Sequence, residues 1–178
     1  MKARKTASVA CSITGTVLLV LVILLCIPAV LPRMMGYEVY TVVSGSMEPE
    51  IPVGSLICIE GAEPTEIAEG EVIAFYSSVD AGAVITHRIV ENRVISGEFI
   101  TKGDANEKED MLPVPYGNVI GRAVFTMPKA GDLLERLTTS AGRTVAVCLI
   151  FAGLLLNGLG GYLGKEPEKR NNRSGKKR

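Results

Sequence analysis

The sequence is poor in the residues that bind metal ions or form covalent cross-links. Its 178 residues include one histidine and four cysteines. Cys11, Cys26 and Cys148 fall within or beside long apolar stretches, which leaves Cys58 as the only thiol in the polar part of the chain. One thiol cannot form a disulfide within its own domain, and no Cys or His spacing suits zinc. The sequence predicts no metal, nucleotide or other cofactor, and the polar region must therefore fold around a hydrophobic core.

Net charge is absent as well, but the two signs are segregated along the chain. The 19 basic and 19 acidic residues cancel overall. Residues 1–32 carry three basic and no acidic side chains, and residues 165–178 carry seven basic and two acidic ones. Residues 33–143 carry nine basic and seventeen acidic side chains. An acidic middle between basic ends argues against nucleic acid as a partner.

Two long stretches contain no charged residue. They cover residues 6–32 and 144–164, which are 27 and 21 positions long. About 20 apolar residues suffice for a helix that crosses a bilayer. Each stretch therefore predicts a transmembrane helix, and Pro28 and Pro32 predict that the first one kinks or ends there.

Each stretch has an alternative interpretation. The first resembles a cleaved secretory signal, because it follows the basic sequence MKARK. Its apolar part is long for such a signal, and no clear small-x-small cleavage site precedes Arg33, so an uncleaved anchor is favoured. The second could be a buried terminal helix, but the basic segment 165–178 that follows is typical of a cytoplasmic tail.

The charge distribution predicts the topology of a multi-pass cell-membrane protein. Basic segments flanking membrane helices remain in the cytoplasm. Residues 1–5 and the tail 165–178 are therefore both expected there. The helices 6–32 and 144–164 would cross the lipid bilayer, and residues 33–143 would form an extracytoplasmic domain.

The predicted extracytoplasmic domain is mainly β. Short segments rich in β-branched and aromatic residues alternate with turn residues, as in antiparallel sheets. The expected strands are residues 37–43, 55–59, 71–76, 84–90, 93–95, 98–102 and 118–125. Glu91 and Asn92 are expected to form a tight hairpin turn. No alternation of helices and strands suggests a parallel α/β sheet, and only residues 131–137 predict a short helix. The fold class is a single compact β-rich domain flanked by two transmembrane helices.

Few side chains in this domain can carry out covalent chemistry. Ser44-Gly45-Ser46 forms a compact turn after the first strand, and the only imidazole belongs to His87. Asp104 and Asp110 follow a later strand. Taken separately, these residues fit a polar loop, a core histidine, a turn aspartate and a solvated acid. Together they supply a serine, a base that can remove its proton near neutral pH, and a carboxylate that can orient the base.

Four short motifs in this region resemble those of type I signal peptidases, in the family's order. They are SGSM-x-P at 44–49, HRIV at 87–90, KGD-x-N at 102–106 and GR at 121–122. The common bacterial branch of that family has lysine where this sequence has His87. In having a histidine at this position, the sequence resembles the archaeal, endoplasmic-reticulum and spore-former branch of the family.

The resemblance implies a role for each candidate residue. Ser46 would be the nucleophile and His87 the general base. The Ser44 hydroxyl and the Ser46 backbone N–H would form the oxyanion hole. Either Asp104 or Asp110 would orient the imidazole. The family spacing favours Asp110, with Asp104 shaping or supporting the site.

The resemblance also implies a membrane-bound serine endopeptidase that removes N-terminal signal peptides from exported preproteins. Small residues at positions −1 and −3 of the substrate would bind as part of an added β-strand. Apolar residues near Met47 and in segment 37–43 are candidates to line the pockets or dip into the membrane interface. The expected partners are preprotein signal peptides, the lipid bilayer and the secretion translocon. A processing protease for a narrow set of secreted proteins and a non-catalytic, membrane-anchored binding or assembly module are the alternatives.

Overall fold

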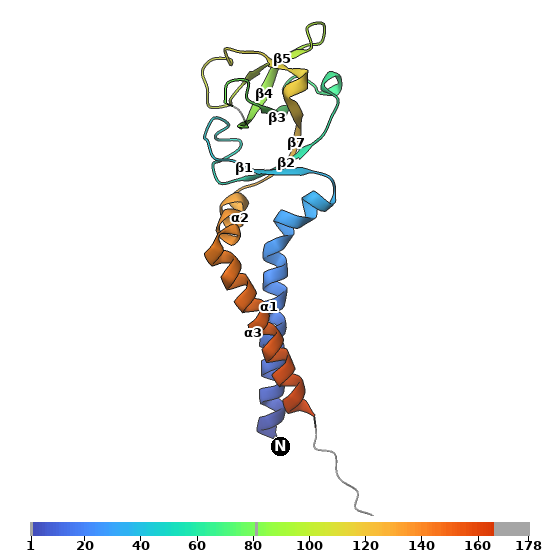
Figure 1. The fold of residues 1–178 in the computed structure, drawn as a ribbon, viewed down its shortest axis with the longest axis vertical. Helices are drawn as coiled ribbons and strands as arrows, with labels where there is room; N and C mark the ends of the chain where they lie inside the picture. The colour runs from blue at the N-terminus through green and yellow to red at the C-terminus, as the bar shows by residue number, and fades with distance from the viewer. Residues whose placement is uncertain (1, 81, 166–178) are drawn as a thin grey trace, which may run out of the picture. The chain divides into compact units, whose positions relative to one another are not determined.

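The computed structural model describes residues 2–80 and 82–165, which form two units (Figure 1). The first unit consists of residues up to Leu25 together with the chain from Arg143 onward. The second unit, Cys26–Gly142, contains the β-rich domain and the last turns of the first helix. The predicted tail beyond Lys165 lies outside the described residues.

Two long helices match the two uncharged stretches of the sequence. Helix α1 covers Lys2–Met34 and helix α3 covers Ser140–Gly164. By length and composition, the segments Arg4–Met34 and Ser140–Gly164 could each cross a membrane. This agrees with the prediction of two apolar helices.

Helix α1 continues through both of its prolines and ends slightly later than predicted. Gly36 has a φ of +90°, and its N–H donates to the Arg33 carbonyl at 3.1 Å. The Tyr37 N–H donates to the Pro32 carbonyl at 3.0 Å. This pair of bonds around a left-handed glycine is a Schellman motif, which satisfies the final carbonyls of a helix. The glycine, and not either proline, therefore ends α1.

Within the first unit, α1 and α3 pack closely through small residues. A Cβ added to Gly160 would lie 2.2 Å from Ser12 Oγ, and one added to Gly15 would lie 2.6 Å from the Gly153 carbonyl oxygen. The Ser8 hydroxyl donates to the Gly160 carbonyl at 2.7 Å. Close approach at glycine and hydrogen bonding by serine are typical of helix association in lipid.

The second unit is built on one antiparallel sheet of seven strands in the order β1-β2-β7-β3-β4-β5-β6. The strands are β1 Glu38–Thr41, β2 Leu56–Glu60, β3 Val72–Tyr76, β4 Val84–Arg93, β5 Glu98–Lys102, β6 Val114–Pro115 and β7 Val119–Met127. The short helix α2, Ala130–Thr138, follows the sheet where a helix was expected. The predicted β-rich fold class is confirmed.

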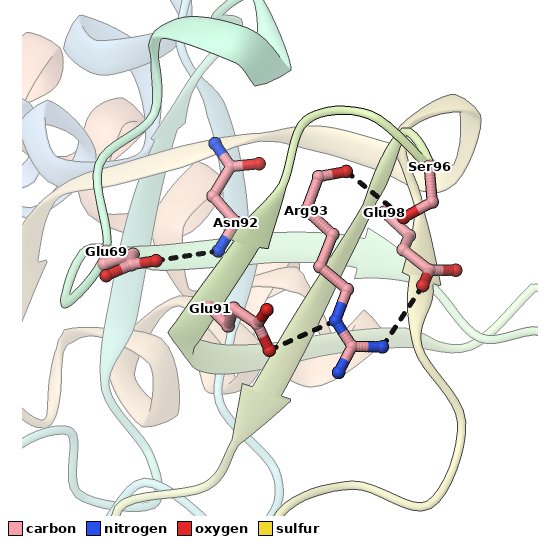
Figure 2. A network of polar contacts seen from close by, with 6 residues as sticks. All are labelled: Glu69, Glu91, Asn92, Arg93, Ser96 and Glu98. Carbon is pink, nitrogen blue, oxygen red and sulfur yellow. Dashed lines mark hydrogen bonds and ion pairs between the residues drawn. The ribbon is translucent and has the colours of Figure 1, made fainter.

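The predicted turn at Glu91-Asn92 is wrong. Strand β4 runs unbroken to Arg93, and the turn to β5 occupies residues 94–97, with Gly97 at a φ of +69°. Figure 2 shows Arg93 in contact with the carboxylate of Glu91 on its own strand and with that of Glu98 across the hairpin. A register shift in the pairing with β5 between Ile89 and Glu91 lets β4 continue. Glycine tolerates the left-handed conformation that the turn requires, which is why the chain reverses there.

Two hydrophobic cores lie on opposite faces of β3. Ile73 and Phe75 belong to one core, whereas Ala74 belongs to the other. This alternation follows from the two-residue period of a strand. The first core also contains Ile67, Ile89, Phe99 and Val114, and the second also contains Met47, Ile51, Ile57 and Ile59. Met47, next to candidate Ser46, belongs to the second core, and Ile89, two residues from candidate His87, belongs to the first.

Candidate active site

The turn that carries Ser46 is anchored by the side chains that follow it. Met47 and Ile51 are 2% and 4% exposed and belong to the second core. The Ile51 N–H donates to the Met47 carbonyl at 2.9 Å, which closes the turn on itself. Because Met47 is fixed in the core, the backbone of Ser46 is fixed beside it.

The turn after β5 binds the Ser46 backbone from the other side. The Ala105 N–H donates to the Ser46 carbonyl oxygen at 2.9 Å. A Cβ placed on Gly103 would lie 2.6 Å from that oxygen and 3.0 Å from His87 Nε2. The oxygen and the imidazole nitrogen are therefore less than about 6 Å apart, since both lie within 3.0 Å of one point. The predicted serine and histidine segments thus meet at Gly103.

The imidazole of His87 is buried, with 8% of the residue exposed, and contacts a carboxylate. Its Nδ1 lies 2.5 Å from Asp110 Oδ2. The Thr101 hydroxyl donates to the same oxygen at 2.6 Å, and the Asp110 N–H donates to the Thr101 carbonyl at 2.9 Å. A carboxylate held against Nδ1 favours the tautomer with its proton there, which leaves the lone pair on Nε2. That nitrogen would lie 3.0 Å from a Cβ on Gly103, the same position that would lie 2.6 Å from the Ser46 carbonyl oxygen.

Asp104 has a different partner. Its two carboxylate oxygens accept from Arg88 Nε at 2.8 Å and from Arg88 Nη2 at 2.6 Å. Arg88 Nη1 also donates to the Gly70 carbonyl at 2.8 Å. The hydrogen bonds to Asp104 raise the pKa of the Arg88 guanidinium. Of the two candidate acids, the fold brings Asp110 onto the imidazole, and it places Asp104 in an ion pair beside the turn that binds Ser46.

Ser44 and Ser46 both line a cavity of about 140 Å³. One wall comes from β1 and the turn after it, and the opposite wall comes from Val84, Ile85 and Thr86 at the start of β4. Among the residues that the structure describes, pairing of β4 with β5 begins at Arg88, so positions 84–87 pair with β3 alone. The cavity therefore borders a strand edge whose second side is free.

The sequence motifs did not assign roles to the residues that position Ser46 and Asp110. Thr101 fixes Asp110, and Gly103 and Ala105 bring the turn against Ser46. Arg88 lies next to His87 in the sequence and was part of a motif, but its partner was not predicted. No group of three potential metal ligands occurs in the described parts of the chain, residues 2–80 and 82–165.

Comparison with known proteins gives relatives of one kind. Signal peptidase I W of Bacillus subtilis (strain 168) is 43% identical over 98 residues, which cover 53% of this chain and 50% of the relative. The signal peptidase complex catalytic subunit SEC11C of Canis lupus familiaris and that of Homo sapiens are each 32% identical over 104 residues, or 52% of this chain and 53% of theirs. The chain is homologous to type I signal peptidases.

This homology confirms the family resemblance that the four motifs predicted, including the branch to which the eukaryotic catalytic subunits belong. The chain spans about half the length of the curated relatives it matches. No protein-family model matches it.

Proposed function

We propose that this chain is a membrane-bound serine endopeptidase that removes N-terminal signal peptides from exported preproteins. The observation that supports the proposal is that the Ser46 backbone and the His87 imidazole both lie against Gly103, while Asp110 contacts the other ring nitrogen. Gly103 approaches both the Ser46 carbonyl and His87 Nε2, while Asp110 contacts His87 Nδ1 at 2.5 Å. The signal peptidase homologues support the same activity.

In the proposed mechanism, the Ser46 hydroxyl attacks the carbonyl carbon of the scissile peptide bond. Its proton passes to His87 Nε2, and the Asp110 carboxylate offsets the charge of the imidazolium that forms. Collapse of the tetrahedral intermediate releases the amine of the mature chain, which takes the proton from Nε2. Water, deprotonated by the same nitrogen, then hydrolyses the acyl–Ser46 ester and frees the signal peptide.

The oxyanion is assigned to two donors at the same turn. The backbone N–H of Ser46 and the hydroxyl of Ser44 are both part of the turn that lines the cavity. Loss of one preorganised donor of this kind costs about 10²–10³-fold in kcat. Ser44→Ala is therefore expected to lower kcat with a smaller effect on KM.

The substrate is proposed to bind as a strand along the free edge of residues 84–87. A peptide on that edge can form backbone hydrogen bonds with β4, as in β-strand addition. Its side chains then alternate between the two faces of the sheet. Ser46 lines the 140 Å³ cavity, so the side chain at −1 would enter that cavity. The side chain at −3 points to the same face of the strand as −1 and would enter the same cavity. The aliphatic walls at Met47, Ile51 and Ile57 leave room for small side chains.

The two apolar helices fit a membrane protein, and both termini are proposed to be cytoplasmic with the catalytic domain on the other side. Ser46 lies ten residues beyond Gly36, which ends α1. Ten extended residues reach at most about 35 Å. A site this close to the end of a spanning helix would meet the cleavage site of a signal peptide where it leaves the bilayer. The translocon is proposed as the source of that substrate.

The test is cleavage of a preprotein by the purified full chain in detergent. Ser46→Ala and His87→Ala are each expected to lower kcat by about 10⁴-fold or more, because the serine and its base act as one unit. Ile95→Ala is the matched control, since this side chain is fully exposed in the β4–β5 turn, and it should cleave at the parental rate. Near-parental turnover by either active-site variant would refute the mechanism.

A further inference from the structure

A second cavity of about 220 Å³ borders the same strand edge. It is lined by Phe75 and Ile85 on β3 and β4, by His87 and Asp110, and by Met111 and Leu112. Leu112 is 55% exposed, so it forms part of the open rim of the cavity. The walls are mostly apolar, and the His87–Asp110 contact lies at their polar end.

The two cavities lie on opposite faces of β4. Ile85 and His87 are two residues apart, so their side chains project from one face, and both line the second cavity. Val84 and Thr86 project from the other face and line the first cavity together with Ser46. Ile85 lines both cavities, so both border the same stretch of β4.

We propose that the second cavity binds the side chain at position −2 of the substrate. The inference rests on the proposed signal peptidase function. If −1 and −3 enter the cavity beside Ser46, the alternation of a β-strand directs −2 to the opposite face, where Ile85 and His87 project. Both of these residues line the second cavity.

The chemistry of the lining predicts a preference at −2. Phe75, Ile85 and Leu112 offer apolar contact to a side chain of leucine size, which alanine would fill poorly. An acidic side chain would be brought towards the carboxylate of Asp110 in a partly buried site, where repulsion between like charges is strong. The order expected at −2 is therefore leucine, then alanine, then aspartate.

The experiment measures kcat/KM for preproteins that differ only at −2, cleaved by the full chain in detergent. Leucine is expected to exceed alanine by about tenfold, the lower end of the range for apolar contacts in a hydrophobic pocket. Leu112→Ser should reduce that ratio to near one, because it replaces apolar lining with a hydroxyl. Leu112→Lys places a positive charge at the rim of the cavity, so it should cleave a preprotein with glutamate at −2 faster than one with leucine there. Misfolding cannot produce such a gain in activity.

Ile95→Ser is the matched control, because it changes an equally apolar but fully exposed residue of the β4–β5 turn. It should leave both the rate and the −2 ratio at their parental values. Cleavage that requires Ser46 but is indifferent to −2 would overturn the inference and leave the proposed function standing. If kcat/KM depended on the +1 residue instead of −2, and Leu112→Ser changed that dependence, the inference would be overturned as well. Cleavage that persists in Ser46→Ala would refute the proposed function itself.

Discussion

Two aspartates six positions apart occupy different electrostatic environments. Asp110 contacts the imidazole of His87 and accepts from the buried Thr101 hydroxyl. Asp104 forms a bidentate ion pair with Arg88, whose side chain is 35% exposed. The first acid can therefore act on the base directly, whereas the second can act only through the turn that it stabilises.

Asp110→Asn and Asp104→Asn should consequently have unequal effects. The asparagine at 110 loses the charge that offsets the imidazolium and can favour the wrong tautomer, so kcat should fall by about 10³–10⁴-fold. The asparagine at 104 keeps one acceptor for Arg88 and loses a charge-assisted bond, which predicts a loss of about 1–2 kcal/mol in the free energy of unfolding. Cleavage assays and urea denaturation of both variants test this. Equal losses of kcat, or a larger one in Asp104→Asn, would mean that Asp110 is not the orienting acid.

The close approach of Gly103 to the Ser46 and His87 segments leads to a second prediction for a single residue. Its φ is not in the left-handed region, but an added Cβ would lie 2.6 Å from the Ser46 carbonyl oxygen and 3.0 Å from His87 Nε2. Gly103→Ala must therefore displace the segment of Ser46 or that of His87, the proposed nucleophile and base. A misplacement of about 1 Å can cost roughly 10²-fold in rate, so kcat should fall by that order.

Gly117→Ala is the control for this substitution. Apart from its chain neighbours, none of the described atoms lies within 4 Å of a Cβ added there, and this glycine also lacks a left-handed φ. It should cleave at the parental rate. If Gly103→Ala were as active as Gly117→Ala, the serine and the imidazole would not need the close approach that the fold provides.

Among the helices and strands, the sequence predicted those whose composition and flanking turns favour them locally. The strand predicted at 98–102 coincides with β5, Glu98–Lys102, because its composition and the flanking turns both favour it. Strand β6, Val114–Pro115, was missed, since two residues ending in proline have no strand pattern. Its pairing depends on the position of β5, which is a tertiary contact.

The candidate site divides in the same way. The motifs proposed Ser46, His87 and the two aspartates as candidates, and the family spacing favoured Asp110 over Asp104. The composition of the single strands gave no reason for that preference. The contact between Asp110 and the imidazole depends on the register Arg88↔Lys102, which aligns β4 with β5 and so directs the segment after β5 towards His87. Register is a property of paired strands and cannot be read from one strand's composition.

The helix pair of the first unit also makes a prediction at the scale of elements. A Cβ on Gly160 would meet Ser12 Oγ at 2.2 Å and the Ser8 carbonyl at 2.8 Å, whereas none of the described atoms lies within 4 Å of a Cβ on Gly161. Gly160→Leu should therefore separate α1 and α3 and remove the Ser8–Gly160 hydrogen bond. The free energy of unfolding should fall by about 1 kcal/mol, the order of magnitude of one polar contact between helices in lipid.

Thermal unfolding of the full chain in detergent, followed by circular dichroism, measures this effect. The matched control is Gly161→Leu, which carries the same added volume on the adjacent residue and should melt at the parental temperature. Equal melting temperatures for the two variants would show that the helices do not depend on this contact.

For the whole molecule, the segregation of charge and the two apolar helices support the proposed topology, which can be measured. If both helices span the membrane, their basic flanks lie on one side, and the positive-inside rule predicts that this side is the cytoplasm. Ile95 projects into solvent from the β4–β5 turn, so a cysteine there reports the compartment of the β-rich domain. In a chain whose four native cysteines are replaced by serine, Ile95→Cys should react with a membrane-impermeant maleimide on intact cells, whereas Arg4→Cys should react only after the membrane is opened. Labelling of Arg4→Cys on intact cells would place the N-terminus outside. A chain with that orientation would carry Ser46 on the cytoplasmic side of the membrane. The proposed function requires Ser46 on the opposite side, so this measurement also tests the proposed function.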